Sequence, residues 1–488
     1  FPTRERPLYG GNPRNDFDET VITSRSLDQA ISMFSPGSRV VKDKQDHFPV
    51  GFAHFIRFKG KITSVDPMGS RLVLARCNDC AVVLAVNIST IIEDGHDPED
   101  AVSICPGCGR PMTNFIAYQP KGFRTTYTGY DYDSSIDVFT PPSGVSLGHV
   151  PSGTTSFSVG ALTVEMLSGK QLVTTNDNRG SYFSGRADSY SSSVIVVNEE
   201  LYEEKIAKFV KKLENNQPRP RGQFAIVDVL TTDILVMTPS NVALNGGILP
   251  TAPALLPAGM AAVASFVQML VRACKDFLQI DSDELKVGLQ PFRVNGRTSQ
   301  RIFVADALEN GSGYSRILGE PGTLKKILSD ILTTTGSRLN DSQQHPGCNS
   351  SCPSCLRSYE NRQVHHLLNW RLGLDLAELL LGQPLQTGRW LSRAPQLVAF
   401  FMAGFDFHNE FQTVTLSTGL SAIVRIDRTK ALLLGHPLWP QEPQFFENAV
   451  ADSLLELEDK YSIAEGNALV SDLYTLEFRP YEIWAKLQ

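Results

Sequence analysis

The sequence predicts a multidomain protein that combines α/β and α+β folds, and three observations support this fold class. The chain has 488 residues, and at roughly 100 to 200 residues per domain this length corresponds to several domains. Short β-branched runs alternate along the chain with stretches of helical spacing. Seven of the eight cysteines are gathered in two compact clusters, at residues 77–108 and 348–355. Each cluster predicts a small metal-stiffened module within the larger fold.

We expect five segments along the chain. The β-branched runs at residues 161–164 and 194–197 lie among Ser, Thr, Gly and Tyr, which is typical of a β-rich domain. After the Pro- and Gly-containing breaker at residues 215–222, strand-like and helical stretches alternate up to a long helix expected over about 361–381. The predicted segments are an N-terminal segment (1–71), a zinc-ribbon module (72–120), a β-rich middle domain (121–222), an α/β domain with the second zinc cluster (223–385) and a small C-terminal α/β domain (386–488).

The first cysteine cluster predicts a closed zinc site. Cys77 and Cys80 form one CxxC pair, and Cys105 and Cys108 form another. Each pair can turn two thiolates toward one tetrahedral ion, and four thiolates leave no open position for a catalytic water. The flanking stretches are predicted hairpin strands, as in a zinc ribbon. We therefore expect this site to stabilise the fold and present a surface.

The second cluster supplies three thiolates and needs a fourth ligand. Cys348, Cys352 and Cys355 follow a CxxxCxxC pattern, which fits a second tetrahedral zinc ion. Candidates for the fourth ligand are His345, His365, His366 and the remote Cys274. His365 is preferred over His345 because it lies at the expected start of a helix, ten residues beyond Cys355. Zinc is thus the expected cofactor, with two sites per chain.

The bulk composition is that of an ordinary globular protein. Apolar residues make up 42% and charged residues 20% of the chain, both close to globular averages. The longest apolar run, residues 252–271, is interrupted by Pro257 and Gly259, so we expect a core helix and no membrane partner. The opening residues lack a basic stretch followed by an apolar one. Together with the few, clustered cysteines, this favours the reducing cytoplasm.

The stretch around the second cluster resembles a known family. Residues 352–365 (CPSCLRSYENRQVH) and 367–376 (LLNWRLGLDL) are similar to the zinc-binding C-terminal domain shared by MrfA-type DNA-repair helicases and the DrmB proteins of the DISARM anti-phage system, and to the DrmB version in particular. Further similar stretches lie at residues 33–38, 175–180, 232–235, 304–306 and 310–314. The resemblance implies a defence function together with a helicase-like ATPase partner, DrmA. It does not imply a motor in this chain.

No motor is expected from the residues themselves. A GxxxxGK[ST] phosphate loop is absent from the sequence, so the chain lacks the parts that hold Mg²⁺ and nucleotide phosphates. Gly311 and Gly313 follow a predicted strand at residues 301–305. Without a third glycine or a lysine, this GxG indicates a tight strand-to-helix turn rather than a phosphate site.

The C-terminal segment raises the alternative of a metal-dependent nuclease. Its expected order of helix, three strands, helix and strand resembles the restriction-endonuclease core. That chemistry needs carboxylates and a lysine around Mg²⁺, whereas the third predicted strand, residues 431–434, contains neither Glu nor Lys. Asp427 and Lys430 are expected in a solvated turn. The segment is therefore interpreted as a degenerate or unrelated α/β domain, and the chain as a nonenzymatic protein.

Candidate DNA contacts are basic residues of uneven distribution. A net charge of −7 and a pI near 5.8 exclude a wholly basic surface but allow a local basic groove. Arg357 and Arg362 beside the second zinc cluster are the preferred phosphate contacts, with Arg371 nearby. The lysine-rich helix at residues 199–214 alternates Lys with Glu, which favours salt bridges on a solvated face.

These observations lead to one prediction and two alternatives. We expect a two-zinc, non-motor accessory subunit of a bacterial anti-phage complex that partners DrmA and helps to bind DNA with a single-stranded portion. The alternatives are a metal-dependent nuclease acting through the C-terminal domain and an adaptor that contacts proteins only.

Overall fold

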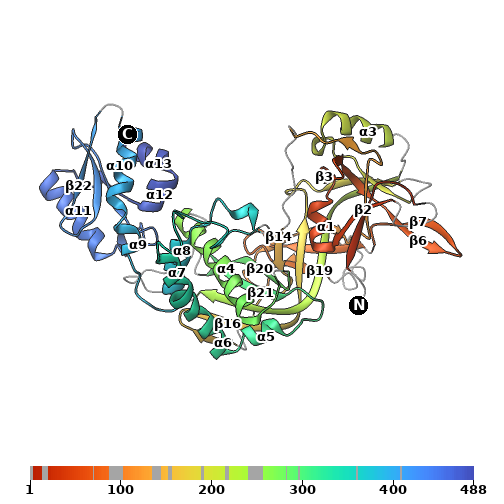
Figure 1. The fold of residues 1–488 in the computed structure, drawn as a ribbon, viewed down its shortest axis with the longest axis horizontal. Helices are drawn as coiled ribbons and strands as arrows, with labels where there is room; N and C mark the ends of the chain where they lie inside the picture. Colours follow the sequence, from red (N-terminus) through yellow and green to blue (C-terminus); the bar gives the residue numbers. More distant parts are fainter. Residues whose placement is uncertain are drawn as a thin grey trace. The chain divides into compact units, whose positions relative to one another are not determined.

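Two compact units make up the structure, which is a computed structural model (Figure 1). Unit 1 comprises residues 1–150 and 169–232, and unit 2 comprises residues 151–168 and 233–488. The structure describes residues 4–13, 20–69, 71–86, 103–134, 144–151, 156–187, 192–214, 219–239, 257–281, 283–294, 297–358, 361–406 and 409–488. The mixed α/β, multi-module class expected from the sequence is observed, while the five segment boundaries stay a prediction.

Unit 1 is built around a mixed β-sheet with an aromatic core. Phe52, Phe123, Phe183 and Phe224 are fully buried in one cluster, and each ring contributes about 1.5–3 kcal/mol by leaving water. Successive strands in the sheet are β2 (Val21–Ser26), β1 (Glu5–Tyr9), β12 (Phe123–Thr125), β5 (Pro49–Phe52), β18 (Val194–Val196), β17 (Phe183–Ala187), β19 (Arg219–Pro239), β11 (Pro111–Tyr118), β8 (Arg71–Arg76) and β9 (Val83–Ala85). The aromatic spacing of short strands thus generates the sheet's buried face.

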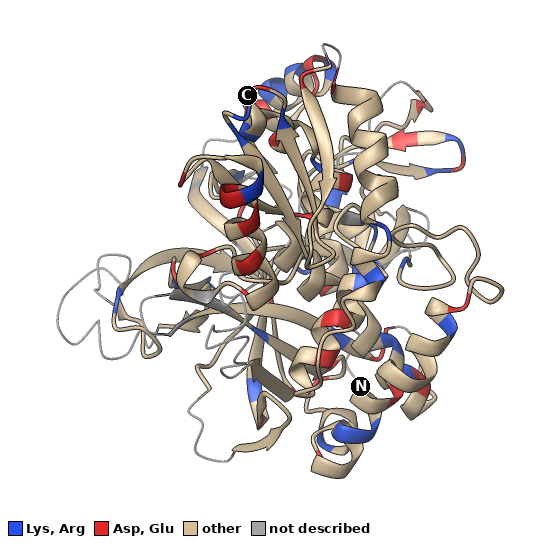
Figure 2. Cartoon of the chain, turned by 90° about the vertical axis from the view of Figure 1, so that its left-hand side faces the viewer, with Lys and Arg blue, Asp and Glu red and all other residues tan. Residues whose placement is uncertain are grey.

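Smaller elements complete unit 1. They are the three strands β13 (Tyr130–Asp131), β4 (Gln45–His47) and β3 (Val40–Lys42), the separate hairpin β6 (His54–Phe58) and β7 (Lys61–Val65), strand β10 (Ser103–Ile104) on β11, strand β14 (Gly144–Leu147) on β16 (Leu162–Asn176), helices α1 (Leu27–Met33) and α3 (Glu204–Glu214), and the 3-10 turn η1 (Glu199–Leu201). Acidic and basic residues are interspersed over the described chain (Figure 2), in keeping with its modest net charge.

Unit 2 is centred on the packing of helix α4 (Pro257–Leu278) against helix α8 (Trp370–Leu380). A Cβ on Gly373 would lie 2.9 Å from Met269 Cε and 3.1 Å from Ser265 Cβ, so only glycine allows this close approach. Helix α4 is long and apolar enough to cross a membrane, but 56% of the tested window is buried in the structure. Its buried residues belong to the main core, which is the arrangement expected of a core helix.

Other elements of unit 2 surround this helix pair. They are strands β15 (Ser156–Val159), β20 (Leu285–Val294) and β21 (Arg297–Asp306), helices α5 (Tyr314–Leu318), α6 (Pro321–Asp330) and α7 (Gly336–Asn340), the π turn η2 (Ile331–Thr335) and the 3-10 turn η3 (Arg362–Val364). Strand β21 pairs antiparallel with both β20 and β19.

The long helix expected over about 361–381 is shorter than predicted. Helix α8 begins only at Trp370, because the Asn369 side chain accepts hydrogen bonds from Arg371 N (3.1 Å) and Leu372 N and thus caps the helix. The preceding residues form the short turn η3. The helical periodicity was present in the sequence, but the capping asparagine set the start one turn or more later.

The C-terminal part of unit 2 has the predicted order of elements. Helices α9 (Gly388–Leu391) and α10 (Ala394–Phe405) precede strands β22 (Phe411–Thr415), β23 (Ser421–Arg425) and β24 (Ala431–Gly435), the turn η4 (Pro443–Phe445), helix α11 (Asn448–Tyr461), strand β25 (Ala468–Asp472) and helices α12 (Leu473–Phe478) and α13 (Pro480–Leu487). Strands β22, β23 and β24 are antiparallel, and β25 joins β24 in parallel.

A buried polar network connects helix α8 to this C-terminal part. Asp375, fully buried, accepts hydrogen bonds from Arg389 and from Trp390 Nε1 at 2.9 Å. His436 Nε2 lies 3.3 Å from the same carboxylate, and Arg389 also pairs with Glu378. Because buried charges are costly unless they are paired, these side chains fix α8, α9 and β24 to one another.

Candidate metal centres and the basic collar

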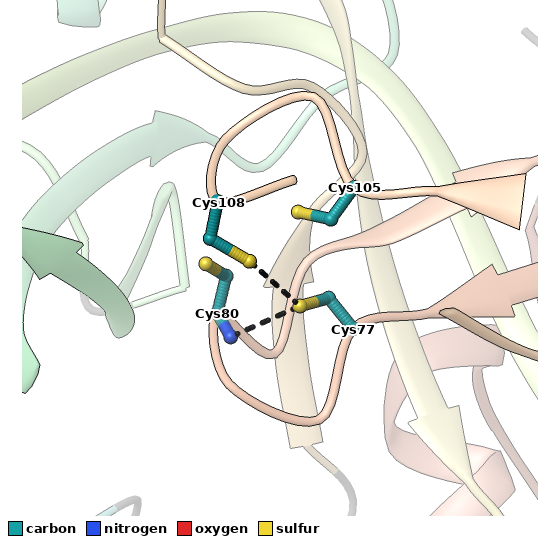
Figure 3. A group of neighbouring side chains, drawn as sticks. All are labelled: Cys77, Cys80, Cys105 and Cys108. Carbon is teal, nitrogen blue, oxygen red and sulfur yellow. Dashed lines mark hydrogen bonds between the residues drawn. The ribbon is translucent and has the colours of Figure 1, made fainter. Parts of the chain in front are cut away.

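The first cysteine cluster has the geometry of a closed zinc site. Cys77 and Cys80 lie in the turn between β8 and β9, and Cys105 and Cys108 lie in the turn between β10 and β11 (Figure 3). All four sulfur atoms lie within 4.8 Å of one another, and Cys77 Sγ is 3.5 Å from Cys108 Sγ. Four thiolates at about 2.3 Å from one zinc ion stand about 3.8 Å apart. The four residues therefore fit the predicted ion.

Two matching turns aim these thiols at one point. Ala81 N donates to Cys77 O and Gly109 N donates to Cys105 O, both at 2.8 Å. Ala81 and Gly109 both adopt a positive φ, of 50° and 71°, which is inexpensive only for glycine. The CxxC motif and its following residue thus fold as one knuckle, used twice.

The second cluster contains His345. Its Nε2 lies 3.4 Å from Cys352 Sγ, while Cys348 Sγ and Cys355 Sγ are 3.9 Å apart. The four ligand atoms lie within 4.8 Å of one another. His345 Nδ1 lies 3.3 Å from Leu339 O, so an N–H at that position directs Nε2 toward the cysteines, as second partners of metal-bound imidazoles do. This set fits a three-cysteine, one-histidine zinc site.

Crowding of the thiols favours a cation at this site. Burial and the neighbouring thiol of Cys355 raise the pKa of Cys348 to about 12. Burial would also raise the pKa of Cys352, but hydrogen bonds from His345 and Cys355 outweigh it and lower that pKa to about 7. Three thiolates in one buried pocket repel one another, and a divalent ion removes that repulsion.

The preference for His365 as the fourth ligand is wrong. His365 Nε2 lies 2.9 Å from Ser358 O and 2.8 Å from Asn361 Oδ1, and it does not belong to the metal-binding group. The turn in which His345 N donates to Asp341 O at 2.8 Å brings His345 to the cysteines instead. A signal was present in the sequence: His345 and Cys348 form an HxxC pair that mirrors the Cys352 and Cys355 pair.

Zinc analysis of two histidine variants tests this assignment. We expect His345→Ala to hold about one zinc per chain, because three thiolates without the imidazole bind the second ion weakly. His365→Ala is the matched control and should keep about two. Metal content measured by mass spectrometry after dialysis separates the two variants. Loss of zinc from His365→Ala with retention in His345→Ala would reverse the assignment.

Four arginines surround the second cluster, and we call them the arginine collar. They are Arg272, Arg338, Arg357 and Arg371. Arg272 donates to Cys355 O at 2.8 Å, and both Arg272 and Arg338 donate to Ser354 O at 3.2 Å. Arg371 donates to Asn349 O at 2.6 Å. The knuckle's backbone carbonyls therefore hold three guanidinium groups at its surface.

The collar carries positive charge that no carboxylate neutralises among the described residues. Arg357 donates to the Ser351 hydroxyl at 2.9 Å, and no collar arginine forms an ion pair within the part of the chain that the structure describes. Burial and the nearby Arg393 lower the pKa of Arg371 to about 10, so it remains charged at neutral pH. A guanidinium that gives one or two of its five N–H groups to a carbonyl retains others for phosphate.

The second predicted DNA contact, Arg362, lies on the turn η3 and is exposed. The structure thus places both Arg357 and Arg362 close in sequence to the second knuckle and adds Arg272 and Arg338, which sequence reasoning missed. Arg272 lies 83 residues before its carbonyl partner Cys355, so only the tertiary fold reveals it. The lysine helix α3 behaves as expected for a paired face, since Lys208 pairs with Glu204 and Lys211 with Glu199.

The GxG turn is filled by the protein's own carboxylate. Asp306, at the end of β21, accepts hydrogen bonds from Ser312 N (2.6 Å), Gly313 N (2.7 Å) and Ser315 N (2.7 Å). These are the N–H groups that a phosphate would need at the start of a helix. The interpretation of this stretch as a tight turn is therefore confirmed.

The residues considered for a nuclease do not form a metal site. Asp427 lies in the exposed turn between β23 and β24, where it accepts hydrogen bonds from Thr429 N and Oγ1 at 3.0 and 2.7 Å. These hydrogen bonds lower the pKa of Asp427, which is the usual effect of stabilising a carboxylate. Within the described ranges, the two cysteine clusters are the only groups of three or more His, Cys, Asp and Glu side chains close enough to share an ion.

Comparison with known proteins assigns one segment of the chain. Residues 266–356 match the family model described as MrfA Zn-binding domain. This segment contains His345 and the three cysteines of the second cluster and ends before His365. It covers less than half of the chain, so the assignment applies to that zinc-binding segment.

Two whole-protein similarities extend beyond this segment. The chain is 22% identical over 404 residues to the Druantia protein DruE of Escherichia coli (strain UMEA 4076-1), which covers 76% of this chain and 20% of that protein. The chain therefore spans about a fifth of the length of this curated relative. It is also similar to the crystal structure of the DUF1998 helicase MrfA bound to DNA, at 8% identity and a TM-score of 0.33, over 76% of this chain and 34% of the other. That score does not establish a common fold.

Proposed function

We propose that the chain is a non-motor, DNA-binding accessory protein of a bacterial defence complex, and that the arginine collar on the second zinc knuckle is its phosphate-binding surface. The observation that carries this proposal is the set of guanidinium groups without carboxylate partners on one metal-stiffened loop. Arginine forks bind phosphate oxygens well, and phosphate contacts dominate affinity for DNA.

The knuckle gives this surface its rigidity. When bound, zinc would hold His345, Cys348, Cys352 and Cys355 in one tetrahedron. The chain's own hydrogen bonds do the rest: Trp370 Nε1 donates to Cys348 O at 3.1 Å, and Arg371 donates to Asn349 O. Fixed guanidinium groups lose less conformational entropy when phosphate binds than free side chains do.

The finer identity of the complex follows from the resemblance to DrmB. We propose that the chain acts with a separate helicase-like ATPase of the DrmA kind, which supplies ATP hydrolysis, while this chain holds DNA that has a single-stranded portion. The match to the MrfA Zn-binding domain and the similarity to DruE support this proposal. A catalytic role in this chain has no support from a phosphate loop in the sequence or from Asp427, which serves its own turn.

DNA-binding measurements on collar variants test the proposal. We expect Arg357→Ala and Arg338→Ala each to weaken binding about three- to tenfold, uniformly across sequences, and to reduce the slope of log K against log salt by about one. Fluorescence anisotropy with labelled single-stranded, forked and duplex DNA between about 50 and 200 mM salt gives both quantities.

The control for this measurement is Arg479→Ala. Arg479 lies in the same unit, is half-exposed and pairs with Glu482 at 2.8 Å, so its loss removes one positive charge that is already neutralised. It should leave affinity and salt slope unchanged. Zinc content of about two per chain would confirm that the variants are folded. Equal affinities of wild type and collar variants, or no binding of DNA by the wild-type chain, would contradict the proposed function.

A further inference from the structure

A second surface suited to nucleic acid lies in unit 1, on the hairpin of strands β6 and β7. The hairpin forms its own two-stranded sheet, separate from the main one, and Figure 1 shows it extending away from the rest of unit 1. Its base is anchored, because the ring of Phe55 packs on Tyr9 with centroids 4.9 Å apart. Its end therefore projects from a fixed support.

The turn at the end of the hairpin has a defined conformation. Phe58 pairs with Lys61 in the strand register, and the two residues between them, Lys59 and Gly60, have φ angles of 49° and 77°. Two successive positive φ angles define a type I′ turn, whose twist matches that of the flanking strands. The side chains at the tip are thus presented on a well-formed ribbon rather than on an open loop.

The tip combines positive charge with an exposed aromatic ring. Arg57, Lys59 and Lys61 are exposed, and no acidic residue occurs in the sequence between Asp46 and Asp66. Phe58 is 59% exposed, and Lys59 Nζ lies 5.4 Å from the centroid of its ring. Neither lysine has a carboxylate partner within the described residues. An exposed phenylalanine between two such lysines is an unfavourable surface unless a partner covers it.

We propose that this hairpin contacts DNA, with Lys59 and Lys61 on phosphates and Phe58 stacked on an unpaired base. Charge complementarity supports a polyanion as the partner. The apolar ring at its centre supports a polyanion that also offers flat aromatic faces, which single-stranded nucleic acid does and an acidic protein surface does not.

The dimensions of the hairpin agree with this role. From His54 to Phe58 the strand rises about 13 Å at about 3.3 Å per residue, more than the depth of about 8.5 Å of a DNA major groove, which admits a two-stranded ribbon. The tip can therefore reach a base while the support remains outside the phosphate backbone. Phe58 is the last strand residue before the turn, where it meets an exposed base end-on rather than reading an edge along the ribbon.

This inference rests on the proposed function, because it concerns the same DNA, and it is tested with the full chain. We expect Lys59→Ala/Lys61→Ala to raise the Kd for forked DNA about tenfold near 0.1 M salt and to lower the salt slope by about 1.8. Phe58→Ala should raise the Kd for forked and single-stranded DNA about tenfold, and Phe58→Trp should restore binding, because stacking needs only a flat aromatic face.

The matched control is Lys208→Ala/Lys211→Ala, which removes two positive charges from unit 1 that are already paired with Glu204 and Glu199. It should bind as wild type. Wild-type affinity in both hairpin variants, while the collar variants still bind weakly, would overturn this inference and leave the proposed function standing. A loss for Phe58→Ala of equal size on blunt duplex DNA would overturn the assignment of Phe58 to an unpaired base. Absence of DNA binding by the wild-type chain would overturn both.

Discussion

Replacement of Cys352 with serine is expected to reduce the zinc content from about two ions per chain to one and to lower the free energy of unfolding by about 4 kcal/mol or more. Loss of a structural metal is among the few single changes with so large an effect, because the energy of metal binding is also folding energy. Cys352 Sγ lies next to His345 Nε2, and Cys352 N donates to Cys355 Sγ at 3.0 Å. Zinc analysis and urea unfolding measure the two effects.

Cys274→Ser is the control for this prediction. Cys274 is the one cysteine outside the two clusters and is 1% exposed in the core of unit 2. Its replacement also buries a hydroxyl in place of a thiol, at a cost of about 1–3 kcal/mol, but the chain should still bind two zinc ions. Two ions in Cys352→Ser, or wild-type stability after zinc loss, would contradict the second metal site.

Asp375→Ala is expected to lower the free energy of unfolding by about 3–5 kcal/mol, because it leaves a buried cation without one of its partners. Arg389 is 7% exposed, and Trp390 Nε1 and His436 Nε2 would also lose their acceptor. Denaturant unfolding of the full chain gives the difference, with DNA affinity and zinc content as separate readings.

An exposed ion pair provides the comparison. Glu482→Ala removes the partner of Arg479 in a pair whose side chains are 48% and 47% exposed, and such pairs contribute at most about 1 kcal/mol. We expect this variant to unfold close to wild type. Equal destabilisation by Asp375→Ala and Glu482→Ala would mean that the Asp375 network does not hold helix α8 to the C-terminal part.

The first metal site was predictable from the sequence because all of its information is local. Each CxxC pair specifies its own knuckle, and two pairs specify a tetrahedron. The second site was predictable only in its cysteines. The choice of His365 rested on an expected helix, whereas Asn369 delays that helix and a turn at Asp341 delivers His345.

The collar was only partly predictable for a related reason. Arg357, Arg362 and Arg371 are near the cluster in sequence, but Arg272 reaches it through the packing of α4 on α8. The C-terminal order of elements was predicted correctly because its strands and helices have strong periodicity. The buried network of Asp375 was not foreseen, since a charged residue inside a helical pattern ordinarily indicates the solvent face.

Helix α8 connects the second knuckle to the rest of unit 2, and this connection makes the amount of folded protein depend on metal supply. Trp370 N donates to Ser350 O at 2.9 Å, so the first turn of α8 rests on the metal-bound loop, and Asp375 further along the helix fixes α9 and β24. Folding is then linked by mass action to the free zinc concentration. In zinc-poor cells a larger fraction of chains would be unfolded and open to proteolysis, so the abundance of this protein should follow zinc availability even when its synthesis is constant.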